Sequence, residues 1–111
     1  MKKTSLIVAL TTVADDRAAA AIARTLIEER LAACVQRMAI ASTYAWEGRV
    51  EDQPEVLLVI KTTAERRAAL RSRLLEMHPY ETPEYVVLEA SDAADAYLAW
   101  ARVSTASDGK S

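Results

Sequence analysis

The order of strand-like and helix-like apolar patterns constrains this chain more than any other feature. Runs rich in β-forming apolar residues predict strands over 5–13, 33–46, 50–62 and 85–88. Apolar residues at helical spacing predict helices over 18–31, from 62 to 77, and from 93 onward. The order β-α-β-β-α-β plus a terminal helix predicts a ferredoxin-like split β-α-β fold. This is an α/β (α+β) arrangement whose two crossover helices cover one face of an antiparallel sheet.

Local signals mark where the predicted helices begin and end. Asp15 is a helix N-cap candidate, and Thr62 with Glu65 has the spacing of a capping box. Asp92 is expected to cap the last helix, while Pro79 and Pro83 stop the second one because proline donates no backbone hydrogen bond.

The two middle strands are too long for the helices that should cover them. Strands of ~13 residues reach ~43 Å, whereas helices of ~15 residues reach only ~23 Å. A turn at Glu47-Gly48-Arg49 joins the strands, and Pro54 predicts a bulge or a sheet edge. The tip carries Tyr44 and Trp46, so we expect neighbouring subunits to bury this hairpin arm. This argument predicts an oligomer without giving its number of subunits.

Length and composition limit the number of domains, the class of partner and the cellular compartment. The 111 residues suit one domain, which we expect over 1–104, with a disordered polar tail over 105–111. A net charge of −2 with interleaved acids and bases argues against a nucleic-acid partner, and no apolar run is long enough to span a membrane. The single cysteine fits a reducing compartment, and the apolar start is interpreted as a strand rather than a signal peptide, so we expect a cytoplasmic protein.

A few side chains carry chemistry that could bind a ligand. His78 is the only histidine. It either binds a ligand or lies at a helix C-terminus, where its imidazole interacts with the negative end of the helix dipole. Cys34 is a soft copper ligand or a small buried thiol. Glu81 and Glu84 lie in a proline-stiffened loop and offer oxygens to a cation, or form a solvated acidic turn. Lys61 either binds an anion or extends to water from the end of its strand.

Five motifs in order resemble those of the CutA divalent-cation tolerance family. They are Glu29-Arg30-Leu31-Ala32-Ala33-Cys34-Val35, Ser42-Thr43-Tyr44-Ala45-Trp46-Glu47-Gly48, Ile60-Lys61-Thr62, His78-Pro79-Tyr80-Glu81-Thr82-Pro83-Glu84 and Tyr97-Leu98-Ala99-Trp100. The resemblance implies a homotrimer similar in architecture to the PII signalling proteins, with no enzymatic activity. It also implies a role in tolerance of copper and other divalent cations.

Side-chain chemistry and the resemblance together nominate site residues. Metal ligands would be His78, Cys34 and Glu81, and the cleft between subunits, where a divalent cation or small ligand would bind, would contain Lys61, Tyr80 and Glu84. Tyr44, Trp46 and Trp100 would contact other subunits. Thr11 and Met77 stand where some family members carry a cysteine and a second histidine, so copper or another divalent cation is expected to bind only weakly.

Three functions remain open at this point. The first is a cation-responsive, PII-like ligand-sensing trimer, and the second is a non-catalytic scaffold without a physiological metal. The third is an enzyme that uses His78 with Glu81 or Glu84, against which stands the lack of any other catalytic motif. We predict no enzymatic activity.

Overall fold

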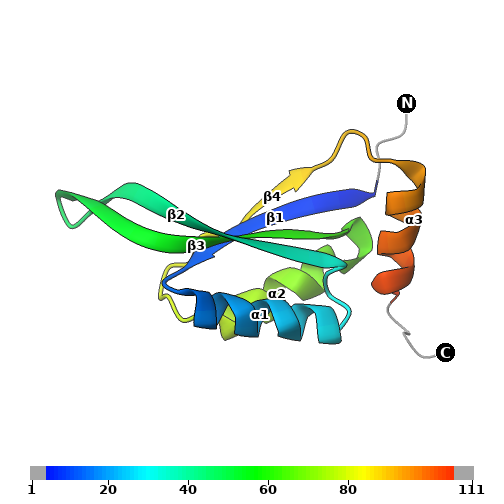
Figure 1. Cartoon of the computed structure of the whole chain (residues 1–111), viewed down its shortest axis with the longest axis horizontal. Helices are drawn as coiled ribbons and strands as arrows, with labels where there is room; N and C mark the ends of the chain where they lie inside the picture. Colours follow the sequence, from blue (N-terminus) through cyan, green and yellow to red (C-terminus); the bar gives the residue numbers. More distant parts are fainter. Residues whose placement is uncertain (1–4, 107–111) are drawn as a thin grey trace.

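The chain forms an α+β domain with one four-stranded antiparallel sheet and three α-helices, and the computed structural model describes residues 5–106 (Figure 1). The strands lie in the order β2-β3-β1-β4, and every neighbouring pair is antiparallel. In chain order the elements are β1 (Leu6–Val13), α1 (Asp16–Glu28), β2 (Cys34–Trp46), β3 (Arg49–Thr63), the 3-10 turn η1 (Ala64–Arg66), α2 (Arg67–Met77), β4 (Val86–Glu89) and α3 (Asp95–Ser104). The expected order of elements is confirmed. Helices α1 and α2 lie on one face of the sheet, and α3 lies at its end (Figure 1).

Helix α1 begins as its sequence predicts and ends earlier than expected. The Asp15 carboxylate accepts the Ala18 N–H at 2.9 Å, which caps the helix. The helix stops because Arg30 adopts a left-handed φ of 61°. The Arg30 N–H donates to the Ile27 carbonyl and the Leu31 N–H donates to the Leu26 carbonyl, which is a Schellman motif. Glycine usually occupies this position, so an arginine here does not signal a helix end.

Arg30 also connects this turn to the far end of the chain. Its guanidinium donates to the carbonyls of Val103 and Ser104 at 3.4 and 3.3 Å, where α3 leaves its last carbonyls without helical partners. Thr105, the first residue of the expected tail, is 2% exposed, and its hydroxyl donates to the Ala101 carbonyl at 2.8 Å. Residues 107–111 of that tail lie outside the described residues.

The β2–β3 hairpin extends well past the helices, as expected. Its register runs unbroken from Cys34↔Lys61 to Trp46↔Arg49, whereas β1 pairs with β3 only as far as Val13↔Val56. The remaining part of the hairpin is a two-stranded arm, made by 40–46 and 49–55, that gives the molecule its 48 Å length (Figure 1). Pro54 lies in this arm, where β3 lacks β1 as a neighbour, so it occupies a local edge and needs no bulge.

Two predicted helix caps are wrong. Thr62 belongs to β3 and pairs with Ile7, so it cannot begin a helix, and η1 starts after Thr63 with no side-chain cap. Pairing with β1 therefore prevails over the capping-box spacing. Asp92 accepts only the neighbouring Ala93 N–H, while α3 begins after Ala94 without a side-chain cap.

The hydrophobic core lies between the sheet and helices α1 and α2. Alternate residues of the central strands point into it, including Ala9, Val13, Leu58 and Ile60, all fully buried. A second, smaller cluster of Leu6, Ala33 and Ala101 attaches α3 to the sheet end. The side chains between these inward positions point to the opposite face, which α1 and α2 leave uncovered and which α3 contacts only at one end (Figure 1).

Candidate functional site

His78 lies directly after α2 and is held on both sides of its ring. The Tyr80 backbone N–H donates to Nδ1 at 3.1 Å, so the ring proton is on Nε2. Nε2 donates to the Thr12 carbonyl at 2.9 Å, and the Thr11 hydroxyl lies 3.1 Å away. The residue is only 8% exposed, and this burial lowers the pKa of His78 despite the Thr12 carbonyl and the Glu55 charge, which oppose the shift. His78 is therefore neutral, and neither ring nitrogen has a free lone pair for a metal.

Tyr80 connects this loop to the base of the arm. Its hydroxyl donates to the Glu55 carboxylate of β3 at 2.8 Å, and its ring lies 4.9 Å from the His78 ring. Burial raises the pKa of Tyr80, and the hydrogen bond to Glu55 raises it further. Sequence analysis missed Glu55, although strand alternation could have placed it with Leu57 and Val59 on the uncovered face.

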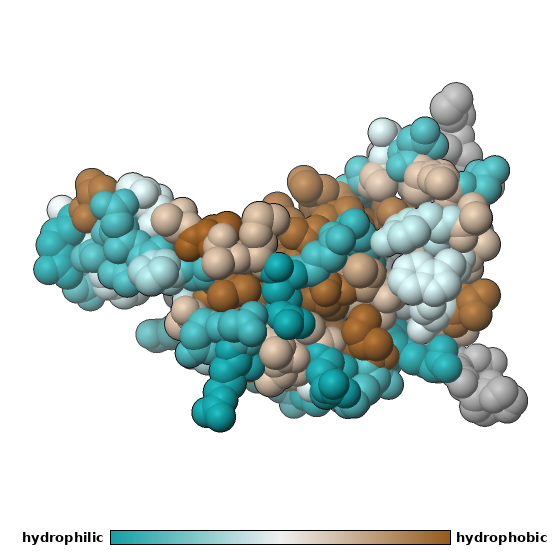
Figure 2. All heavy atoms as spheres, in the orientation of Figure 1, coloured by the Kyte–Doolittle hydropathy of each residue, from teal (hydrophilic) through white to brown (hydrophobic). Residues whose placement is uncertain are grey.

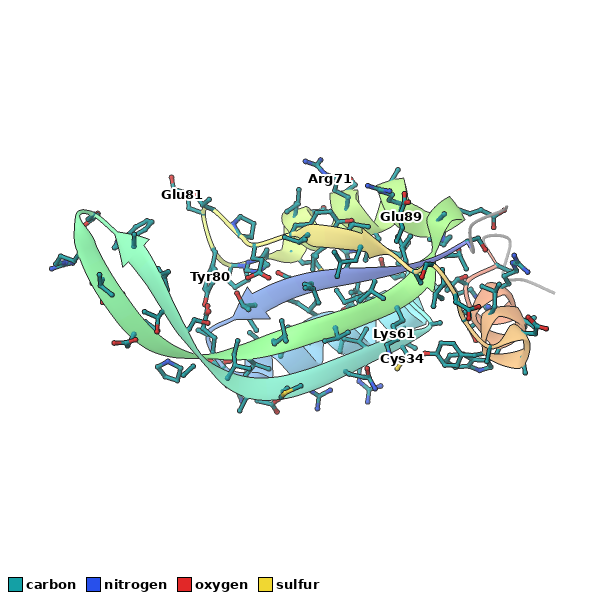
Figure 3. All side chains as sticks on the ribbon, turned by 90° about the horizontal axis from the view of Figure 1, so that it is seen from above. Cys34, Lys61, Arg71, Tyr80, Glu81 and Glu89 are labelled. Atoms are coloured by element: carbon teal, nitrogen blue, oxygen red, sulfur yellow. The ribbon has the colours of Figure 1, made fainter. Side chains whose placement is uncertain are left out.

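The acidic residues of the loop do not join this network. Glu81 and Glu84 are both exposed, and neither forms a hydrogen bond or ion pair with another residue of 5–106. Figure 3 shows the Glu81 side chain directed outward from the loop, beyond Tyr80.

Cys34 and Lys61 lie far from the His78 loop. They are direct partners across β2 and β3, at the end of the sheet next to α3 (Figure 3). There the Lys61 ammonium lies 6.0 Å from the centre of the Tyr97 ring, and the Tyr97 and Trp100 rings are 5.4 Å apart. The residues nominated for one cleft thus lie at opposite ends of β1 within a single subunit, some beside α3 and the others at the base of the arm.

The arrangement does not fit a resident metal centre within one subunit. Within 5–106, no three or more His, Cys, Asp or Glu side chains gather closely enough to hold a metal ion. His78, Cys34 and Glu81, the nominated ligands, are not brought together, and the ring nitrogens of His78 are already occupied.

An open groove of 390 Å³ between α1 and β2 contains none of the nominated residues. Its floor is apolar, and its arginines are paired: Arg24 with Glu28 at 3.4 Å and Arg37 with Asp16 at 3.3 Å. In the described part of the chain, no helix has the length and apolar character needed to cross a bilayer.

The nominated subunit contacts are exposed in the single chain. Tyr44 and Trp46 on the arm are 42% and 52% exposed, and Trp100 on α3 is 47% exposed. Tyr44 and Trp46 lie on the same face of β2 as Met38, because an even number of residues separates them along the strand. They therefore continue the uncovered face of the sheet along the arm.

Comparison with known proteins places this small α+β domain, with its long hairpin and terminal helix, in one family. Residues 7–104 match the family described as CutA1 divalent ion tolerance protein. The divalent-cation tolerance protein CutA of Pectobacterium atrosepticum is 43% identical over 99 residues, which are 88% of this chain and 90% of that protein.

Solved structures agree over nearly the whole chain. CutA from Synechococcus elongatus superposes with a TM-score of 0.91 at 36% identity, covering 96% of this chain and 95% of that one. The divalent cation tolerance protein from Thermus thermophilus gives 0.85 at 40% identity, covering 90% and 98%. The chain belongs to the CutA1 divalent ion tolerance family, whose members are generally not catalytic.

Proposed function

We propose that this protein acts in tolerance of, or response to, divalent metal ions such as copper, as a homotrimer that binds a small ligand between its subunits in a PII-like manner. The observation that carries the proposal is the family match over residues 7–104, together with relatives named for divalent-cation tolerance. Because residues 5–106 of one subunit form no cluster of metal ligands, the cation acts through weak binding or through a ligand at the assembly.

The uncovered face of the sheet supports assembly. It is lined by a continuous set of apolar side chains: Val8, Leu10, Met38, Leu57, Val59, Val86 and Leu88. Met38, Val86 and Leu88 are 57%, 45% and 53% exposed in the single chain. Figure 2 shows hydrophobic side chains along the side of the body opposite the helices, between the arm and α3. A monomer rarely exposes such a patch, so we expect other subunits to cover it.

Light scattering at micromolar concentration tests the assembly, with the mass of three chains as the expected result. Leu88→Asp places a charge on the uncovered face and should lower the mass to that of one chain. Ala68→Asp, on the exposed surface of α2, is the matched control and should remain trimeric. A wild-type monomer would contradict the proposal, whereas a dimer would support burial of the arm and exclude the threefold assembly.

The cation role requires its own test. Cells that make the wild-type protein should tolerate added copper better than cells that make Leu88→Asp at the same level. Equal growth at every copper concentration would contradict the role in tolerance. Such a result in a stable trimer would instead favour a scaffold without a physiological metal.

A further inference from the structure

The arm leaves the body of the domain at the point where β1 ends. Strand β1 pairs with β3 as far as Val13↔Val56, so Glu55 is the first residue of β3 without a neighbour on that side. From there to its turn the arm is two strands wide. An isolated two-stranded hairpin is only marginally stable in water, and its twist varies more than that of a wider sheet. The sheet alone therefore holds the direction of the arm only loosely.

The segment that follows α2 connects the end of β1 to the base of the arm. The His78 ring holds the β1 side: Nε2 donates to the Thr12 carbonyl at 2.9 Å, and the Thr11 hydroxyl lies 3.1 Å away. The Tyr80 backbone N–H donates to Nδ1 of the same ring at 3.1 Å. Pro79 lies between them with its φ fixed by the pyrrolidine ring, so the segment is short and stiff.

Tyr80 makes the contact with the arm. Its hydroxyl donates to the Glu55 carboxylate at 2.8 Å, and both residues are half-buried (Figure 3). Such a bond to an ionised acceptor is stronger than one to a neutral acceptor. Within 5–106, it is the one side-chain hydrogen bond or ion pair between the arm and the rest of the chain. The other side-chain bonds of the arm join its own residues, Thr43 with Asp52 and Arg49 with Glu51.

We propose that Tyr80 is a positioning residue whose bond to Glu55 sets the direction of the arm relative to the body of the domain. His78 holds Tyr80 in place, and Pro79 fixes the geometry between them, so the three residues act as a brace at the base of the arm. The brace acts within one chain and requires neither three subunits nor a role in cation tolerance. The mass measurements described above test assembly separately.

Hydrogen exchange of the assembled protein, followed by mass spectrometry of peptides from the arm and the body, tests the brace. Tyr80→Phe removes only the hydroxyl. We expect amides at the base of the arm, in 39–42 and 53–56, to exchange about tenfold faster, which is the effect of losing one hydrogen bond to a charged group. Amides of α1 and β1 should exchange at the wild-type rate, because the loosening is local.

Thr43→Val is the matched control. It also removes a hydroxyl that donates to a carboxylate, that of Asp52 at 2.6 Å, but this bond lies within the arm, so exchange at the base should not change. Glu55→Ala should reproduce the effect of Tyr80→Phe and serves if that variant fails to fold. Glu55→Gln keeps an acceptor for the hydroxyl and should have a smaller effect.

Three results would overturn the brace. The first is wild-type exchange at the base of the arm in both Tyr80→Phe and Glu55→Ala. The second is an equal rise in exchange in α1 and β1, which would show that the bond contributes only to global stability. The third is the same pattern in Thr43→Val, which would show that the arm loosens whenever it loses any side-chain hydrogen bond.

Discussion

Lowering the pH should destabilise this protein through His78 alone before its carboxylates are protonated. In the folded chain Nδ1 accepts the Tyr80 N–H and Nε2 donates to Thr12, so an added proton can bind only at Nδ1. It would then oppose the Tyr80 N–H and place a charge on a ring that is 8% exposed. Glu55 is the charged group that acts on His78, and its attraction is weaker than the cost of burial.

The sign and the size of the effect follow from this geometry. Burial lowers the pKa of His78 below its ordinary 6.5, so the unfolded chain takes up the proton at a higher pH than the folded chain. The free energy of unfolding is therefore at its full value above pH 6.5 and falls as the pH drops from 6.5 to the folded pKa. For one proton the slope reaches at most about 1.4 kcal/mol per pH unit.

Urea unfolding between pH 5 and 7.5, at one fixed protein concentration, measures this slope. His78→Gln is the control because it keeps a polar side chain and has no proton to gain in this range. It should be less stable at pH 7.5, by about 1–3 kcal/mol, since buried partners of the ring lose their hydrogen bonds. Its stability should change less with pH than that of the wild type. Parallel pH curves for the two proteins would refute the reasoning.

Three further predictions concern the arm, the α1 turn and copper. Trp46→Ala should lower the melting temperature of the assembled protein, because truncating an aromatic ring that a neighbour fully buries costs about 3–5 kcal/mol of stability per site. An unchanged melting temperature and mass would show that the tip stays in solvent. Arg30→Ala should cost about 1 kcal/mol in urea unfolding by losing its bonds to α3, and Arg30→Gly should cost less because glycine accepts the left-handed φ of 61°; equal costs would exclude strain at Arg30. Calorimetry should show weak copper binding, preferred over magnesium and unchanged in His78→Ala because both ring nitrogens of His78 are already hydrogen-bonded; nanomolar affinity, or loss of binding in His78→Ala, would contradict it.

Much of the fold could be predicted because it depends on local patterns. The apolar runs of β1 and β3 and the helical stripe of α1 are properties of nearby residues, and the Asp15 cap needs only the N–H of Ala18. The excess length of the β2–β3 hairpin is likewise a matter of counting residues against the helices. The prediction that Thr62 caps a helix was wrong because a residue distant in sequence decides its structure: pairing with Ile7 keeps Thr62 in β3.

Individual residues of the candidate site were predicted from the sequence, but the contacts among them were not. His78 and Tyr80 were both singled out from their motif, yet nothing local indicated that Thr12, 66 residues away, would take one ring nitrogen. The bond from Tyr80 to Glu55 also joins two elements that the sequence does not connect. Lys61 and Tyr80 were assigned to the same cleft, but within one subunit Lys61 lies next to α3 and Tyr80 lies at the base of the arm (Figure 3).

The sequence by itself determined the order of the elements, the excess length of the middle hairpin and the family. Each of these is encoded in spacing along the chain, where hydrophobic burial and backbone geometry act on neighbours. Only the tertiary structure decided that His78 is a neutral, fully hydrogen-bonded side chain and that Lys61 lies beside Tyr97 of α3. Hydrogen bonds and charges depend on distances of a few ångströms between residues far apart in sequence, and those distances exist only once the sheet and α3 have packed.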